Sequence, residues 1–215
     1  VASPAMVATL RPDAVVVATG AARRRPDVPG VDLDHVLSGD DLRVLLTGEG
    51  DLGSRQPGII VRTVLAVGHL LGLTADLNRV RSLSRWWMPL GRQIVVVGGG
   101  LVGTELAEFL ARRGRTVTVL EDGGDLATEM AHPRRWRAPH EARAHGVDFR
   151  TSAHLVAITP NEVVAAVTEG DGVVTEERFS ADAVLLAGGV EPDPSLADAI
   201  RIAVGDTVGV HVVGD

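Results

Sequence analysis

The pattern of apolar and polar positions is most regular over residues 93–121. Residues 94–97 form a continuous β-branched run, which is typical of a parallel strand covered on both faces. A glycine-rich turn follows, then a segment with apolar residues at helical spacing, and then a second apolar run at 116–120. The pattern therefore predicts a strand, a helix and a second strand. The helix residues expected to face the sheet are Val102, Leu106, Phe109 and Leu110.

Shorter apolar runs predict further strands along the chain. They lie at residues 14–18, 147–151, 155–158, 163–168, 173–179, 183–187 and 210–213. A helix is expected from Pro133 to His145, with Gly146 after its end. The Gly170-Asp171-Gly172 sequence is a hairpin signal, so the strands around it are expected to form a small antiparallel meander beside the parallel sheet.

The glycine-rich turn has the form Gly-x-Gly-x-x-Gly. Gly98 permits a tight turn, Gly100 lets the backbone approach a diphosphate, and Gly103 lets the helix pack closely on the strand. Because the diphosphate of a dinucleotide binds to the N–H groups at such a helix N-terminus, we expect this segment to hold it. The expected contact residues are Gly98, Gly99, Gly100, Leu101, Val102 and Gly103.

Glu121 follows the second strand, at about the 20-residue offset expected for an acid that binds the adenosine ribose. Its carboxylate would accept hydrogen bonds from the ribose hydroxyls and repel a 2′-phosphate, which favours NAD(H) over NADP(H). A 2′-phosphate could be held by Arg134, Arg135 and Arg137, so binding of NADP(H) stays open. The other interpretation of these arginines is an exposed basic turn. Two alternatives stay open: the strand–helix–strand unit binds no nucleotide, or Glu121 is a solvated acid at the end of a strand.

Composition removes several classes of function. The 215 residues include no cysteine, which excludes disulfides and thiolate metal sites, and the net charge of −7 argues against a nucleic-acid partner. The most apolar stretch, 59–73, is interrupted by Arg62 and His69, so no membrane span is expected. His140 and His145 are five residues apart, which does not suit two metal ligands on one helix face. We expect a cytoplasmic protein without a metal site.

The markers along the chain resemble those of the two-dinucleotide-domain flavoproteins, and more narrowly the NADH:flavin oxidoreductase group that includes 2,4-dienoyl-CoA reductase and trimethylamine dehydrogenase. Besides the glycine turn, the markers are Ala18-Thr19-Gly20, Ala187-Gly188-Gly189 and Gly214-Asp215. The resemblance implies a Rossmann-like, three-layer α/β fold in which an NAD-type domain is inserted in a partial FAD-type domain. The implied parts are residues 1–91, 92–180 and 181–215, the first and last belonging to the FAD-type domain.

The resemblance also implies cofactors and roles. Thr19, Gly20, Gly188, Gly189 and Asp215 would contact FAD in the complete protein, which would also carry a flavin-barrel domain and a first FAD-binding glycine turn that this chain lacks. The chain would be the NAD(H)-binding electron-entry module of a flavin-dependent oxidoreductase.

No catalytic residue is expected on this chain. Glu105 follows the glycine turn and is therefore a candidate for a contact on the nicotinamide side of the ligand. The alternative is that Glu105 is a solvated helix residue. Two alternatives to the electron-entry module stay open: an ADP-binding domain that moves no hydride, and an inactive truncated fragment.

Overall fold

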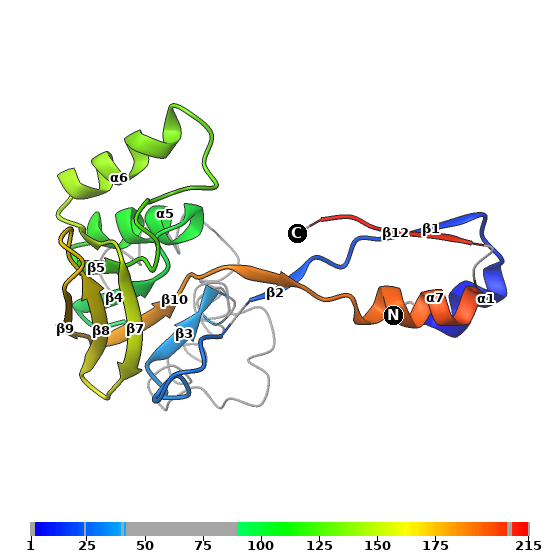
Figure 1. Cartoon of the computed structure of the whole chain (residues 1–215), viewed down its shortest axis with the longest axis horizontal. Helices are drawn as coiled ribbons and strands as arrows, with labels where there is room; N and C mark the ends of the chain where they lie inside the picture. Colours follow the sequence, from blue (N-terminus) through cyan, green and yellow to red (C-terminus); the bar gives the residue numbers. More distant parts are fainter. Residues whose placement is uncertain (1–2, 24, 40, 42–89, 206–207, 215) are drawn as a thin grey trace, which may run out of the picture. The chain divides into compact units, whose positions relative to one another are not determined.

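The computed structural model describes residues 3–23, 25–39, 41, 90–205 and 208–214, and these form two compact units (Figure 1). Unit 1 combines residues 1–24 with 189–215, and unit 2 consists of residues 25–188. The apolar stretch at 59–73 and the terminal Asp215, both used in the predictions above, lie outside the described residues.

A parallel sheet forms the centre of unit 2. Its strands, in order across the sheet, are β3 (Val36–Ser38), β10 (Ala183–Leu186), β4 (Gln93–Val97), β5 (Thr116–Leu120) and β6 (Asp148–Arg150). All neighbouring strands run parallel. Ile94, Val95 and Val96 of the central strand β4 are buried, as expected for a β-branched run covered on both faces.

Among the described residues, one face of this sheet is covered by α5 (Leu101–Ala111) and α6 (Arg134–Ala144) (Figure 1). Ala107 and Leu110 of α5 and Ala142 of α6 share a hydrophobic cluster with Ile94 and Val96 of β4. Adjacent residues of β4 point to opposite faces, so Val95 belongs to a different cluster. The helix predicted at 133–145 is confirmed, and α6 continues through its internal Pro139.

The other face is covered by an antiparallel meander of β7 (Ala153–Ile158), β8 (Glu162–Thr168) and β9 (Val174–Ser180). Val163 and Ala165 of β8 pack in one cluster with Val95 and Val184 of the parallel sheet. Unit 2 therefore has three layers, of helices, parallel sheet and meander. The predicted Rossmann-like α/β fold class and the hairpin through residues 170–172 are confirmed.

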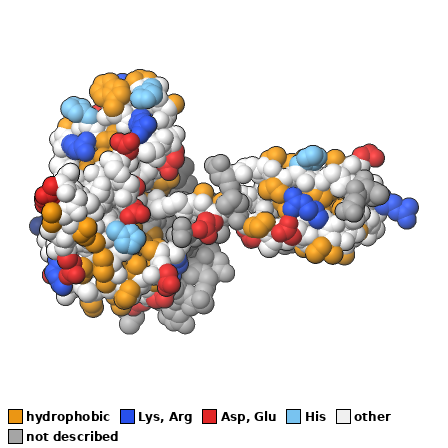
Figure 2. Space-filling view, viewed as in Figure 1, with side chains coloured by type: hydrophobic (Ala, Val, Ile, Leu, Met, Phe, Trp, Pro, Cys, Tyr) orange, Lys and Arg blue, Asp and Glu red, His pale blue; other side chains and the backbone are white. Residues whose placement is uncertain are grey.

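The described residues of unit 1 form two small sheets and two helices. The elements are α1 (Pro4–Leu10), β1 (Ala14–Val17), β2 (Ala21–Arg23), β11 (Val190–Pro192), α7 (Ser195–Val204) and β12 (Gly209–Val212). β1 pairs in parallel with β12, and β2 pairs antiparallel with β11. Val17 and Ile200 are buried in its core, whereas Val16 and Ile202 are exposed. Hydrophobic side chains are visible on the surface of this unit in Figure 2.

One detail of the predicted α5 packing is wrong. Val102 was expected on the buried face of the helix, but it is 42% exposed. Gly103, Thr104, Ala107 and Leu110 are the buried residues of α5 instead. The buried face begins at Gly103, one residue later than predicted, because this glycine packs against the backbone of Gly98 in the preceding turn.

The connection from β9 to β10 meets the start of β4. Asp182 Oδ2 accepts hydrogen bonds from the backbone N–H groups of Arg92, at 2.7 Å, and Gln93, at 2.9 Å. These bonds lower the pKa of Asp182, with the Gln93 N–H as the larger cause. In the described part of the chain, none of the helices is long and apolar enough to cross a membrane.

Candidate dinucleotide-binding site

The glycine turn begins directly after β4. Gly98 has φ +108°, a conformation that favours glycine, and its N–H donates to the Leu120 carbonyl at 2.8 Å. A Cβ at this position would lie 2.8 Å from both the Ala187 carbonyl carbon and the Gly188 nitrogen. The turn is therefore fixed between the ends of β5 and β10, at the carboxyl edge of the parallel sheet, where ligands of such sheets bind.

The third glycine sets how closely α5 approaches this turn. A Cβ at Gly103 would stand 1.8 Å from the Gly98 carbonyl oxygen and 2.9 Å from its carbonyl carbon. No L side chain fits there without moving backbone. Gly103 thus allows the close packing of helix on strand that the sequence predicted.

The backbone groups of Gly99 are held by two side chains and by one backbone N–H group. The Gly99 N–H donates to Glu121 Oε2 at 2.6 Å. The Gly99 carbonyl accepts from the Thr104 hydroxyl at 3.0 Å and from the Ala127 N–H at 2.9 Å. Because Thr104 is completely buried, its hydroxyl is a fixed part of the turn. The backbone N–H groups of the turn are oriented before any ligand arrives.

A carboxylate is bound at the N-terminus of α5, here called the mouth of the helix. The Leu101 N–H donates to Glu129 Oε2 at 2.6 Å. A Cβ on Gly100, whose φ of −68° is ordinary for any residue, would lie 2.6 and 2.7 Å from the two carboxylate oxygens of Glu129. An anion therefore occupies the position that the helix dipole and the N-terminal N–H groups favour for negative charge.

Glu121 lies half-buried at the end of β5, beside the glycine turn. Its Oε1 accepts from the Gly123 N–H at 2.9 Å, while its Oε2 is bound to the Gly99 N–H. Each carboxylate oxygen has a second acceptor site, so the side chain can still bind hydroxyl groups. The structure thus brings the predicted ribose acid and the predicted diphosphate turn together.

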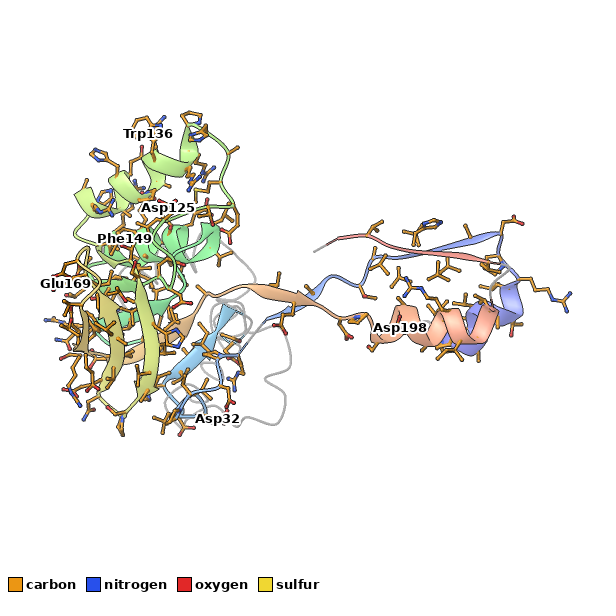
Figure 3. The ribbon with its side chains drawn as sticks, viewed as in Figure 1. Asp32, Asp125, Trp136, Phe149, Glu169 and Asp198 are labelled. Carbon is orange, nitrogen blue, oxygen red and sulfur yellow. The ribbon has the colours of Figure 1, made fainter. Side chains whose placement is uncertain are left out.

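Each of the other charged candidates forms an ion pair. Glu105 is exposed and forms an ion pair with Arg134, so α5 and α6 are bridged there. Arg135 pairs with Asp125 at 3.2 Å. Arg137 pairs with Glu141, one turn along α6, at 2.8 Å. Figure 3 labels Asp125, which lies in the connection between β5 and α6. Each of the three arginines considered for a 2′-phosphate therefore has a carboxylate partner.

The predicted FAD-contacting residues are distributed over both units. Gly188 lies at the end of unit 2, against Gly98. Thr19, Gly20 and Gly189 belong to unit 1, where Gly20 precedes β2 and Gly189 precedes β11. Because these strands are antiparallel, Gly20 and Gly189 lie at opposite ends of their ladder. Asp215 is outside the described residues.

Sequence reasoning missed three residues that shape the site: Thr104, Ala127 and Glu129. Thr104 lies next to Gly103, and its helix-interior hydroxyl was a readable signal for a bond to nearby backbone. Ala127 and Glu129 have no spacing relation to the glycine turn, and only the path of the loop after β5 brings them there. Among the described residues, no cluster of three or more His, Asp or Glu could hold a metal ion.

A glycine-rich turn at the carboxyl edge of a parallel sheet, within three layers, defines a dinucleotide-binding fold of the Rossmann class. The family model "Pyridine nucleotide-disulphide oxidoreductase" matches residues 5–213, and the chain belongs to this family. FAD and NAD(H), the cofactors predicted from the sequence, are those of the family.

Two curated relatives are similar over about half of the chain. A nitric oxide reductase FlRd-NAD(+) reductase of Salmonella gallinarum is 31% identical over 114 residues, which are 53% of this chain and 29% of that protein. An NADH oxidase of Thermoanaerobacter brockii is 32% identical over 124 residues, 57% of this chain and 18% of that protein. The chain matches less than a third of the length of either relative.

Among solved structures, 2-naphthoyl-CoA reductase in complex with 2-naphthoyl-CoA has the same fold, with a TM-score of 0.62 and 21% identity. The match covers 100% of this chain and 25% of that one. At this identity the likeness concerns the fold, and it agrees with the three layers of unit 2.

Proposed function

We propose that the chain binds a nicotinamide dinucleotide and acts as the electron-entry module of a flavin-dependent oxidoreductase. The glycine turn from Gly98 to Gly103, including Gly99, Gly100, Leu101 and Val102, binds the diphosphate through backbone N–H groups. Glu121 binds the adenosine ribose. In the predicted division of the chain, these residues fall in the NAD-type part at 92–180.

One observation carries the proposal: the mouth of α5 already holds an anion. The Leu101 N–H binds a carboxylate oxygen at 2.6 Å, and that carboxylate lies over Gly100, where a side chain would block it. A diphosphate needs the same donor and the same space. The residues present therefore fit the group that the family implies.

The charges near Glu121 support NAD(H) as the ligand. The carboxylate of Glu121 would repel a 2′-phosphate, and Arg134, Arg135 and Arg137 are each engaged by another carboxylate. An arginine would have to give up its ion pair to bind the additional phosphate. We expect NADH to bind at least tenfold more tightly than NADPH, measured by titration calorimetry under the same conditions.

The second cofactor would be FAD in the complete protein, contacted by Thr19, Gly20, Gly188, Gly189 and Asp215. The nicotinamide and the flavin supply the hydride chemistry when bound, and the protein positions them. This chain's residues hold the diphosphate and orient the ribose. The ion pair of Glu105 with Arg134 supports a positioning role of Glu105 at the junction of α5 and α6.

The narrower membership proposed here is the NADH:flavin oxidoreductase group, with a flavin-barrel domain elsewhere in the parent protein. The fold shared with 2-naphthoyl-CoA reductase over the whole chain supports this choice. The cytoplasm is the proposed location. The final substrate would be bound by parts of the protein beyond this chain.

The substitution Gly100→Ala tests the proposed site. Its φ of −68° accepts alanine, and the atoms nearest to the new Cβ belong to the flexible Glu129 side chain, so the fold should persist. The methyl group would stand where the diphosphate approaches, and an overlap costing about 1–3 kcal/mol should weaken NADH binding by roughly tenfold or more. Gly170→Ala is the matched control, because its Cβ meets nothing within 4 Å.

Titration calorimetry with NADH gives the answer. Because the new Cβ also displaces the Glu129 carboxylate, the comparison is repeated in a Glu129→Ala background. If Gly100→Ala binds NADH as tightly as Gly170→Ala in both backgrounds, the diphosphate does not lie on this turn. If ADP and NADH bind the unmodified chain equally, the nicotinamide half contributes nothing. The chain would then be the structural ADP-binding domain considered above and not an electron-entry module.

A further inference from the structure

The carboxylate of Glu129 occupies the place proposed for the diphosphate. It accepts the Leu101 N–H at 2.6 Å, and both of its oxygens lie within 2.7 Å of the Cβ position of Gly100. These two observations are independent, since one concerns a donor and the other the space above the turn. They place a negatively charged group of the chain itself where an anionic ligand would bind.

Glu129 belongs to a segment that folds over the glycine turn, residues 122–133, here called the strap. The Ala127 N–H donates to the Gly99 carbonyl at 2.9 Å, which fixes the strap to the turn. Ala127 and Met130 are buried in a small cluster with Ala138 of α6. The ion pair between Arg135 and Asp125 attaches the strap to α6 a second time. The backbone bond and the packing hold the strap closed, whereas the ion pair of the 78% exposed Asp125 contributes little.

A diphosphate and the Glu129 carboxylate cannot both accept the Leu101 N–H in this geometry. They carry charge of the same sign, so placing the second anion beside the first would cost energy as well as space. Dinucleotide binding then requires Glu129 to leave the mouth of α5. Only molecules in which the Glu129 contact is open can bind the ligand. The apparent dissociation constant is therefore the intrinsic constant divided by the fraction of open molecules.

We propose that Glu129 is a built-in competitor of the dinucleotide diphosphate, and that the strap is a gate that opens when the ligand displaces this carboxylate. The proposal rests on the proposed dinucleotide site. It adds a residue that sets the affinity of that site without contacting the bound ligand.

A simple helix cap would use the same hydrogen bond but predicts a different result. A cap contributes to the stability of α5 and leaves ligand affinity unchanged, or lowers it when it is removed because the turn loosens. A competitor raises ligand affinity when it is removed, even though the protein becomes less stable. Stability and affinity thus change in opposite directions only if Glu129 competes.

The experiment compares Glu129→Gln and Glu129→Ala with Asp125→Asn in the full chain. Asp125→Asn removes the same charge from the same strap, but Asp125 contacts Arg135 and not the turn. NADH binding should tighten by about 3- to 30-fold for Glu129→Gln, the range for a charge-assisted contact at an exposed helix end, and at least as much for Glu129→Ala. Asp125→Asn should change it by less than about twofold.

Adenosine is the second probe, because it has the base and ribose but no phosphate. Its weak binding, followed by NMR titration, should be the same in the unmodified chain and in both Glu129 variants. A gain for adenosine equal to that for NADH would mean that the strap merely became looser, which would overturn the competition. Thermal unfolding of each variant shows that the chain compared is folded.

The two proposals fail in different ways. If the unmodified chain binds NADH and the Glu129 variants bind it with equal or lower affinity, the competitor is refuted and the dinucleotide site stands. If neither the unmodified chain nor the Glu129 variants bind NADH, the site itself is refuted and the competitor with it. If only the variants bind NADH, both proposals are supported, and nearly all molecules of the unmodified chain have the gate closed.

Discussion

The substitution Gly103→Ala is the most direct test of how α5 is packed on the parallel sheet. Gly103 is buried in the first turn of α5, and a Cβ there would stand 1.8 Å from the Gly98 carbonyl oxygen and 2.9 Å from its carbon. Both atoms belong to the backbone of the glycine turn, so no side-chain rotation relieves the overlap. The helix or the turn has to move by more than an ångström, a shift estimated from the overlap and from the close packing of protein interiors.

The net effect combines two opposing terms. Alanine is preferred to glycine in a helix by up to about 1 kcal/mol. Overpacking in a buried position typically costs about 1–3 kcal/mol, and an overlap with backbone belongs at the upper end of that range. We therefore expect Gly103→Ala to lower the free energy of unfolding by about 2 kcal/mol. For a chain of this length, that corresponds to a fall in Tm of about 4–8 °C.

Urea unfolding followed by circular dichroism at 222 nm measures this loss. Gly170→Ala is again the control, since its Cβ meets nothing within 4 Å and the change should stay within about 0.5 kcal/mol. NADH affinity should fall together with stability in Gly103→Ala, because the same displacement disturbs the turn. A Gly103→Ala chain as stable as the unmodified one would refute the close approach of α5 to Gly98.

Two further predictions concern packing and pH. Leu110→Ala removes a completely buried side chain and should cost about 2–5 kcal/mol in urea unfolding, whereas Val102→Ala, at a 42% exposed position, should cost less than about 1 kcal/mol. The N–H groups of Gln93 and Arg92 lower the pKa of Asp182, so its stabilising contribution is present above about pH 4 and is lost as the pH falls through the lowered pKa. Asp182→Asn should weaken this acid dependence in thermal unfolding, and an unchanged profile would contradict it.

Local patterns sufficed for the strand, turn, helix and strand at residues 93–121, because each part has a short-range cause. The β-branched run makes β4, Gly98 makes the turn with φ +108°, and the acid after β5 lies beside that turn. The meander was also predictable, since its strands are adjacent in sequence and joined by a glycine-containing hairpin. In these regions, neighbours in sequence are neighbours in space.

The order of strands across the sheet was not predictable in this way. The amino-acid sequence of residues 182–189 is nearly the same as that of residues 13–20. The two strands nevertheless pair differently: β10 lies between β3 and β4 in unit 2, while β1 pairs with β12 in unit 1. The short strand β3 gave no signal that distinguished it from a loop. Pairing partners distant in sequence depend on the chain between them, which local hydrophobicity does not describe.

The contact of Glu129 with the glycine turn was also not predictable from local sequence patterns. The glycines predicted an anion at the mouth of α5, and the structure places one there that belongs to the chain itself. With a net charge of −7, the protein attracts an anionic ligand only through local donors, since charges more than about 8 Å away are largely screened. Arg134 and Arg135 are paired with Glu105 and Asp125. Recognition of the diphosphate would therefore depend on backbone N–H groups, and a single carboxylate bound to one of them is enough to control the affinity of the site.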